Sequence, residues 1–318
     1  SDETDEQVPD DDTCSVNQIA KEFSKKVLLY EEAVTLKSEY VLNLANNSSF
    51  DKIASSATNG TVQIFSLTAT GLSRSSEFLI ELERKSSVCG LSFTKNDSNN
   101  LFVGTTDGSL LLYDLRTSKQ QFSMVTGDTP EDKRRITCFD INSNDRIICA
   151  GTEQVLEDVY LIFFDVRQKS LLGGYWRSHE NDITTVKFHP DNPDLLISGS
   201  VDCLINVFDI SETTEDDALK TVINTEDSIA RVRWHKNVYK KDIVSCITNT
   251  NEFKMYEVEE AKTLCEYCRS DITNAIKRKS VDDCYIINCH NLDEFGNQFL
   301  LAGSNYNKGE TLRSLQIQ

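Results

Sequence analysis

Four cysteines and a histidine near the C-terminal end of the sequence have the side chains needed for metal binding. Cys265 and Cys268 are separated by two residues, and Cys284 and Cys289-His290 follow. Paired thiolates at such spacing can hold zinc in a tetrahedral site. However, Cys284 and Cys289 flank a stretch with the alternating pattern of a strand, and they would project from it in different directions. We therefore predict ordinary buried cysteines here, with no metal and no cofactor.

The remaining residues with catalytic potential lack the neighbours that catalysis requires. Asp and Glu are abundant, but no pair is framed by a motif that would raise one pKa and keep the other carboxyl ionised. The small-residue run 198–200 is not part of a Gly-x-Ser-x-Gly elbow. Gly173-Gly174 is followed by Tyr-Trp and not by the Lys-Ser/Thr pair of a phosphate loop. We predict a protein that is not an enzyme.

A repeated unit organises the chain. It consists of an apolar strand, a loop, a second apolar strand that ends on small residues, a tight turn, and an alternating third strand that ends on an aromatic-acid pair. The clearest copy spans 179–210, with strands predicted at 183–188, 195–198 and 204–208. The unit is about 45 to 50 residues long, which is the length of a four-stranded propeller blade. Further copies are predicted at 53–67, 101–116, 136–167, 229–258 and 272–317.

Two features recur at fixed places in these copies. Asn59-Gly60 and Asp107-Gly108 are dipeptides that favour a hairpin turn, because both central residues of that turn adopt positive φ. His189 and His235 both stand at the end of a first strand. This recurrence indicates that the two histidines have structural roles.

Over nearly its full length the chain resembles the WD40-repeat proteins, and the resemblance implies an all-β, WD40-type β-propeller. In that family a His before the first strand, a Ser or Thr in the second, an Asp in the next turn and a Trp in the third strand are hydrogen-bonded together. His179, Ser198 and Asp202 match three of these positions in one blade. Phe208 replaces the Trp and has no indole N–H to donate. We therefore expect this blade to depend more on packing than on its polar set.

The same resemblance suggests a partner. Two consecutive copies end in Asp-x-Arg, at Asp114 to Arg116 and at Asp165 to Arg167. In WD40 proteins that are substrate receptors of cullin-four ubiquitin ligases, this ending contacts the ligase adaptor, although Tyr113 here stands where those proteins have Trp. The alternative is that both arginines form local ion pairs, worth under about 1 kcal/mol when exposed. We expect a protein-protein interaction scaffold, with the ligase receptor as the alternative.

Composition narrows the class of partner and the location. The net charge of −18 repels phosphate backbones, and the three small basic clusters are separated along the chain, so we expect no nucleic-acid binding. No apolar run approaches the roughly 20 residues of a membrane helix. The ten cysteines lie mostly in apolar runs, which suits a reducing compartment. We expect a monomer in the cytoplasm, the nucleus or both. The basic clusters lie at 133–135, 236–241 and 277–279.

The domain organisation follows from the same patterns. Residues 1–25 are acidic and poor in apolar side chains, which predicts a disordered tail, and 26–318 are predicted to form a single propeller domain. Six blades are recognisable, whereas the family usually has seven. The apolar segment 27–30 could supply the outer strand of the last blade and close the ring. We favour a truncated or gapped seven-bladed ring over a ring of six.

Overall fold

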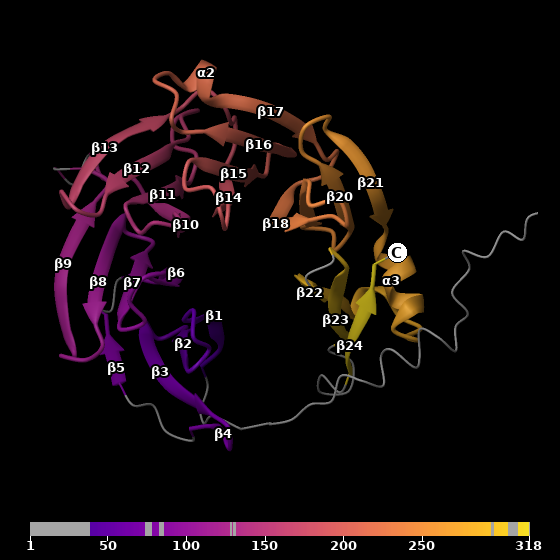
Figure 1. Cartoon of the computed structure of the whole chain (residues 1–318), viewed down its shortest axis with the longest axis horizontal. Helices are drawn as coiled ribbons and strands as arrows, with labels where there is room; N and C mark the ends of the chain where they lie inside the picture. Colours follow the sequence, from indigo (N-terminus) through magenta and orange to yellow (C-terminus); the bar gives the residue numbers. More distant parts are fainter. Residues whose placement is uncertain are drawn as a thin grey trace, which may run out of the picture.

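The computed structural model describes residues 39–73, 78–82, 86–127, 129, 132–293, 296–304 and 311–317. Six antiparallel sheets follow one another around a common axis, as Figure 1 shows, with the first strand of each sheet nearest the axis. The predicted all-β propeller with six blades is therefore confirmed.

Blades 1 to 3 each contain four strands in sequence order from the axis outward, and blade 1 carries an additional short strand, β4, at the end of β3. Blade 1 consists of β1 (Val41–Asn46), β2 (Lys52–Ala57), β3 (Thr61–Thr68), β4 (Gly71–Leu72) and β5 (Phe78–Glu81). Blade 2 consists of β6 (Val88–Phe93), β7 (Asn100–Thr105), β8 (Ser109–Asp114) and β9 (Lys119–Val125). Blade 3 consists of β10 (Ile136–Ile141), β11 (Ile147–Thr152), β12 (Leu161–Asp165) and β13 (Ser170–Tyr175).

Blades 4 and 5 repeat the four-stranded pattern, and the described part of blade 6 has three strands. Blade 4 consists of β14 (Ile183–Phe188), β15 (Leu195–Ser200), β16 (Leu204–Asp209), the helix α2 (Glu215–Ala218) and β17 (Leu219–Asn224). Blade 5 consists of β18 (Ile229–Lys236), β19 (Asp242–Thr248), β20 (Phe253–Glu257) and β21 (Lys262–Tyr267). The helix α3 (Arg269–Ala275) and the 3-10 turn η1 (Val281–Asp283) precede blade 6, which consists of β22 (Cys284–Asn291), β23 (Gln298–Ser304) and β24 (Thr311–Gln316).

The core lies between successive blades. The second strand of each blade is the most deeply buried, because both of its faces pack against neighbouring sheets. Blade 2, for example, packs Phe102 and Leu110 against Ile136, Phe139 and Ile148 of blade 3. Fully buried strands of this kind read as continuous apolar runs in the sequence, which is why these strands were recognisable.

Hydrogen bonds between first strands fasten adjacent blades. The Thr137 hydroxyl donates to the Ile183 carbonyl, linking blades 3 and 4. One blade further on, the Thr184 hydroxyl donates to the Ile229 carbonyl at 2.6 Å. At the other end of the strands, His189 Nε2 lies 3.0 Å from Asp242 Oδ1. The structural role predicted for His189 is therefore a link between blades 4 and 5.

The boundary of the last repeat differs from the prediction. Ile272 does not begin a strand but lies buried in α3, and the first strand of blade 6 begins at Cys284. Asp271 in the first turn of α3 accepts a hydrogen bond from the backbone N–H of Cys268, at the N-cap, at 3.0 Å. This capping favours a helix over a strand at that point.

Several predictions about the ends of the ring fall outside the described residues. The acidic tail 1–25 and the apolar segment 27–30 both lie there. Within the described part of the chain, the strands of blades 1 and 6 do not lie side by side in Figure 1. No described helix is both long enough and apolar enough to span a membrane.

Candidate functional site

The two Asp-x-Arg endings form identical turns after the third strands of blades 2 and 3. In blade 2, the backbone N–H of Arg116 donates to Asp114 Oδ1 at 2.9 Å. In blade 3, the backbone N–H groups of Arg167 and Gln168 both donate to Asp165 Oδ1 at 2.8 Å. Each aspartate therefore closes its own turn, as Asx turns do. The aspartates stabilise the turns, so the turns do not require the arginine side chains.

The arginine side chains project into solvent. The Arg116 side chain is 77% exposed, and its Nη2 lies 3.6 Å from Asp114 Oδ2. Arg167 is also exposed, and it forms no ion pair with a described residue. Desolvation alone would raise the pKa of Asp114, but the backbone N–H of Arg116 and the hydroxyl of Thr117 lower it below its usual value. The local ion pair considered as an alternative thus exists, weakly, in blade 2 only.

Both turns lie on one rim of the propeller, together with the loops that join the first and second strands. The backbone N–H of Leu115 donates to the Asn99 carbonyl, and that of Val166 donates to the Arg146 carbonyl. The two blades are also joined at their outer strands, where Lys169 Nζ stands 4.8 Å from the centre of the Phe122 ring. We call the surface that carries Arg116 and Arg167 the arginine rim.

An apolar groove lies beside the Arg167 turn, between blades 3 and 4. Its volume is about 380 Å³. Leu171 and Leu172, at the start of the outer strand β13, are 48% and 51% exposed. Exposed apolar side chains and exposed arginines on one blade are typical of a protein-binding surface. The sequence interpretation missed this groove, although the pair of leucines in an outer strand was a visible signal. The groove is lined by Ile147, Phe163, Leu172, Gly173, Gly174, Tyr175, Asp194 and Ile210.

The predicted polar set of blade 4 is assembled in the structure. His179 Nδ1 lies 2.9 Å from Asp202 Oδ2, and His179 Nε2 lies 2.7 Å from Ser198 Oγ. The Asn206 amide, on the third strand, stands 3.3 Å from His179 Nε2. Phe208 is fully buried and packs 5.4 Å from the ring centre of Tyr175. Blade 4 therefore combines the polar set with aromatic packing in place of the missing indole.

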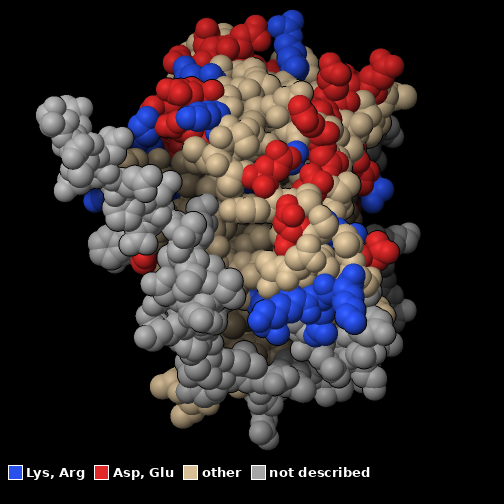
Figure 2. Space-filling view, turned by 90° about the vertical axis from the view of Figure 1, so that its right-hand side faces the viewer, with Lys and Arg blue, Asp and Glu red and all other residues tan. Residues whose placement is uncertain are grey.

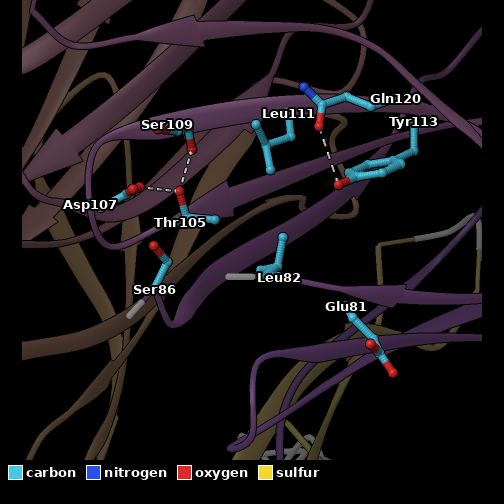
Figure 3. Close-up of a pocket in the computed structure, with 9 residues that line it drawn as sticks. All are labelled: Glu81, Leu82, Ser86, Thr105, Asp107, Ser109, Leu111, Tyr113 and Gln120. Carbon is cyan, nitrogen blue, oxygen red and sulfur yellow. Dashed lines mark hydrogen bonds between the residues drawn. The ribbon is translucent and has the colours of Figure 1, made fainter. Parts of the chain in front are cut away.

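A polar groove of about 260 Å³ lies between blades 1 and 2. Figure 3 shows Thr105, Asp107 and Ser109 at one end of it and Tyr113 with Gln120 at the other. The Thr105 hydroxyl lies 2.5 Å from Asp107 Oδ1, and the Tyr113 hydroxyl donates to Gln120 Oε1 at 3.4 Å. Desolvation would raise the pKa of Asp107, but the Thr105 hydroxyl and the Lys133 charge lower it. Both hydrogen bonds join residues of blade 2 to one another.

The cysteines considered as zinc ligands are distributed over three elements. Cys265 lies in β21 and Cys268 precedes α3, whereas Cys284 and Cys289 are both fully buried in β22. The prediction that these last two project in different directions is wrong. A register shift between Ile286 and Asn288 turns both into the same core cluster against blade 5. The described residues contain no group of three His, Cys, Asp or Glu side chains arranged to hold a metal ion.

His235 of blade 5 uses one ring nitrogen to contact blade 6 and the other to contact the next strand of its own blade. Nδ1 lies 2.7 Å from Asn291 Oδ1, and Nε2 lies 2.8 Å from Ser245 Oγ. Burial lowers the pKa of His235 from 6.5 to about 4, and the nearby Arg233 contributes to the shift. The imidazole is therefore neutral in the folded protein at physiological pH, which fits the structural role predicted for it.

This shift predicts a loss of stability in mild acid. Because the folded pKa is below the unfolded one, the unfolded chain takes up the proton first, and stability falls as pH decreases from about 6.5 toward about 4. Between pH 7.5 and pH 5 we expect a loss of about 2 kcal/mol from His235. Urea unfolding at both pH values will measure it. In His235→Gln the loss should shrink by that amount, and an equal loss in both proteins would refute the assignment. Asp202 and Asp242, whose pKa values are lowered, titrate below this window.

The basic clusters occupy surface loops, as predicted. Lys277 and Lys279, which follow α3, are both exposed. Figure 2 views the face that carries β21 and α3, where Lys and Arg form one band and Asp and Glu are spread above it. On this face the band of positive charge lies below a region in which acidic side chains are more frequent.

The fold and a family comparison together define the class of protein. The WD domain, G-beta repeat family matches residues 171–209, which cover most of blade 4. The chain folds as a six-bladed β-propeller that contains a WD40 repeat, and WD40-repeat propellers generally serve as protein-interaction scaffolds.

Comparison with individual proteins gives a narrower likeness. The chain is similar to WD repeat-containing protein 89 homolog of Dictyostelium discoideum, with 25% identity over 211 residues, 66% of this chain and 54% of that protein. It is 28% identical over 261 residues to WD repeat-containing protein GTS1 of Arabidopsis thaliana, covering 80% of this chain and 62% of the relative. The chain thus spans little more than half the length of these relatives.

Proposed function

We propose that this propeller is a non-enzymatic scaffold that binds partner proteins through the arginine rim. The observation that carries the proposal is the division of roles in the two Asp-x-Arg turns. Asp114 and Asp165 accept hydrogen bonds from backbone N–H groups, while the side chains of Arg116 and Arg167 are exposed on consecutive blades, with a 3.6 Å ion pair to Asp114 at Arg116. Exposed arginines held on rigid turns bind at low entropic cost, and arginine is enriched at the centres of protein interfaces.

The apolar groove beside Arg167 completes this surface. An interface needs a desolvated apolar centre with polar residues around it. Leu172, which lines this groove, supplies exposed apolar area in the outer strand of blade 3. A partner that presents acidic side chains flanked by apolar ones matches this arrangement. The free thiols of the nine described cysteines support a location in the cytoplasm, the nucleus or both.

A second candidate function is that of substrate receptor in a cullin-four ubiquitin ligase, with the arginine rim docked on the ligase adaptor. The specific observation in its favour is that the turn occurs twice, in neighbouring blades and on the same rim. Two equivalent arginines at that spacing present a double anchor, which a single Asp-x-Arg ending does not.

Replacing both arginines tests the two candidates together. We expect Arg116→Ala with Arg167→Ala to reduce capture of rim-dependent partners from cell extract at least tenfold, without lowering the melting temperature. The change removes two exposed anchors of about 1 to 2 kcal/mol each. Affinity purification with mass spectrometry measures it. The matched control is Arg135→Ala with Arg177→Ala, which removes two exposed arginines from loops on the opposite rim.

The outcomes separate the candidates. Recovery of the cullin-four adaptor by the wild type and the control, but not by the rim variant, would establish the receptor function. Loss of other partners only, with the adaptor absent throughout, would establish a scaffold of another kind. Equal recovery of all partners by all three proteins would refute the arginine rim as a binding surface.

A further inference from the structure

Strand pairing places three charged residues at equivalent positions around the propeller axis. In blades 3, 4 and 5 the pairs are Asp140 with Cys149, Lys187 with Ile197, and Arg233 with Ser245. Each of these partners lies three residues before the end of the second strand of its blade. They lie on the first strands, which are nearest the axis in Figure 1. All three side chains remain at least partly exposed, as expected for positions that face the axis.

The strand β18 adds another cation on the same side. Val232 and Trp234 of this strand are buried against blade 4, so the alternating residues Arg231 and Arg233 point the other way, and both are exposed. Arg231 Nη1 donates to the Ile287 carbonyl of blade 6 at 2.8 Å, which fixes its position. Arg233 forms no ion pair with any described carboxylate within 4 Å.

One carboxylate lies among these cations, and it is already engaged. Asp140 Oδ2 accepts a hydrogen bond from the backbone N–H of Phe188 at 2.9 Å. Its other oxygen, Oδ1, lies 3.9 Å from Lys187 Nζ. Lys187 itself is 42% exposed. Asp140 therefore contacts Lys187, and it is the described carboxylate whose charge acts on Arg233, in a protein whose net charge is −18.

The surroundings of Arg233 increase the effect of its charge. Desolvation by the enclosing protein lowers the pKa of the guanidinium below its usual value, and the neighbouring Arg231 lowers it further. The Arg233 side chain is nevertheless exposed, so its guanidinium is accessible to an anion from solvent. Low-dielectric surroundings strengthen the field of a charge in such a position.

We propose that Lys187, Arg231 and Arg233 form an anion-binding site at the propeller axis, which takes the carboxylate or phosphate groups of an acidic segment in a partner protein. The two guanidiniums supply planar donor pairs that match such oxygens, and Lys187 supplies a point charge. The inference rests on the proposed scaffold function but not on the arginine rim. It adds a second binding surface that recognises a different chemistry.

Peptide binding tests the site directly. Three fluorescein-labelled twelve-residue peptides serve as probes: one alternates Glu and Gly, one replaces each Glu by phosphoserine, and one replaces each Glu by Gln. We expect the wild type to bind at least one acidic peptide with micromolar affinity, more weakly as salt rises, and to ignore the Gln peptide. Arg231→Gln with Arg233→Gln should weaken binding at least tenfold, measured by fluorescence anisotropy. Inorganic phosphate as competitor shows whether the anionic group alone suffices.

Two further variants test whether weaker binding comes from the lost charges and not from unfolding. Lys187→Gln alone removes one cation without touching the hydrogen bond to Ile287, and should weaken binding about three- to tenfold. Lys119→Gln with Arg177→Gln removes two exposed cations from outer positions and should change nothing. Equal binding by the wild type and both site variants, or no binding of either acidic peptide by the wild type, would overturn the proposal. Capture of partner proteins that depend on the arginine rim, measured with the same protein samples, tests the proposed scaffold function separately from the axis site.

Discussion

Replacing His179 by alanine is expected to lower the free energy of unfolding by about 3 kcal/mol. The imidazole is buried and lies within hydrogen-bond distance of both Ser198 and Asp202. Alanine would leave a buried hydroxyl and a partly buried carboxylate without their partner, and it would open a cavity between them. Urea unfolding monitored by circular dichroism measures the change.

The matched control is Ser211→Ala in the same blade. Ser211 also bonds an aspartate, Asp209, but its side chain is exposed, so its loss should cost well under about 1 kcal/mol. If His179→Ala cost no more than Ser211→Ala, aromatic packing around Phe208 would be the dominant support of blade 4. That is the balance the sequence suggests, and this comparison decides it.

Gly108→Ala is expected to destabilise the propeller by about 3 kcal/mol or more. Gly108 adopts φ +88° in the hairpin turn between β7 and β8, where an L side chain is strained. A Cβ atom there would lie 2.3 Å from the Arg134 carbonyl oxygen and 2.5 Å from Thr126 Oγ1. The turn and the loop at Arg134 cannot separate without breaking the contact between blades 2 and 3. Thermal and urea unfolding measure the loss.

Gly60→Ala isolates the contribution of the backbone angle. Gly60 occupies the corresponding turn of blade 1 with φ +80°, but the nearest atom to an added Cβ is 3.4 Å away. We expect a loss of about 1 to 2 kcal/mol there, from the positive φ alone. Similar losses at both glycines would show that the Arg134 loop yields and that the close contact is not a constraint.

The sequence predicted the repeat well where local signals and burial agree. The turns at Asn59-Gly60 and Asp107-Gly108 fall where predicted, and both glycines have positive φ. Asn59 and Asp107 do not, so the expectation of positive φ at both central residues is wrong for these turns. The strands of blade 4 match their predicted ranges within two residues. In these blades each apolar run is bounded by turn residues, so the periodicity of the sequence and the packing of the sheets give the same answer.

The sequence was least informative at blade 6. Its apolar residues at 272 and 276 fit a buried helix as well as a strand, and the capping of α3 by Asp271 decided for a helix. The shift in β22 that turns Cys284 and Cys289 to one side is a bulge, and a bulge reverses every inference from alternation beyond it. Neither feature has a signature in residue types alone.

The proposed binding residues also include some that the sequence revealed and some that it did not. The Asp-x-Arg endings were visible in the sequence, because their residues are consecutive. The cations at the axis come from β14 and β18, and only the pairing of those strands with β15 and β19 shows that Lys187 and Arg233 are equivalent. Separation along the chain hides such a cluster until the blades are assembled.

The turn after the third strand has a consequence for how a propeller can change partners. Asp209 in blade 4 bonds the backbone N–H of Ser211 at 3.1 Å, just as Asp114 bonds that of Arg116. The aspartate thus maintains the loop whatever residue follows two places later. Substitutions at that later position should change the stability of the fold little. New binding specificities can therefore evolve on this rim while the propeller fold is retained.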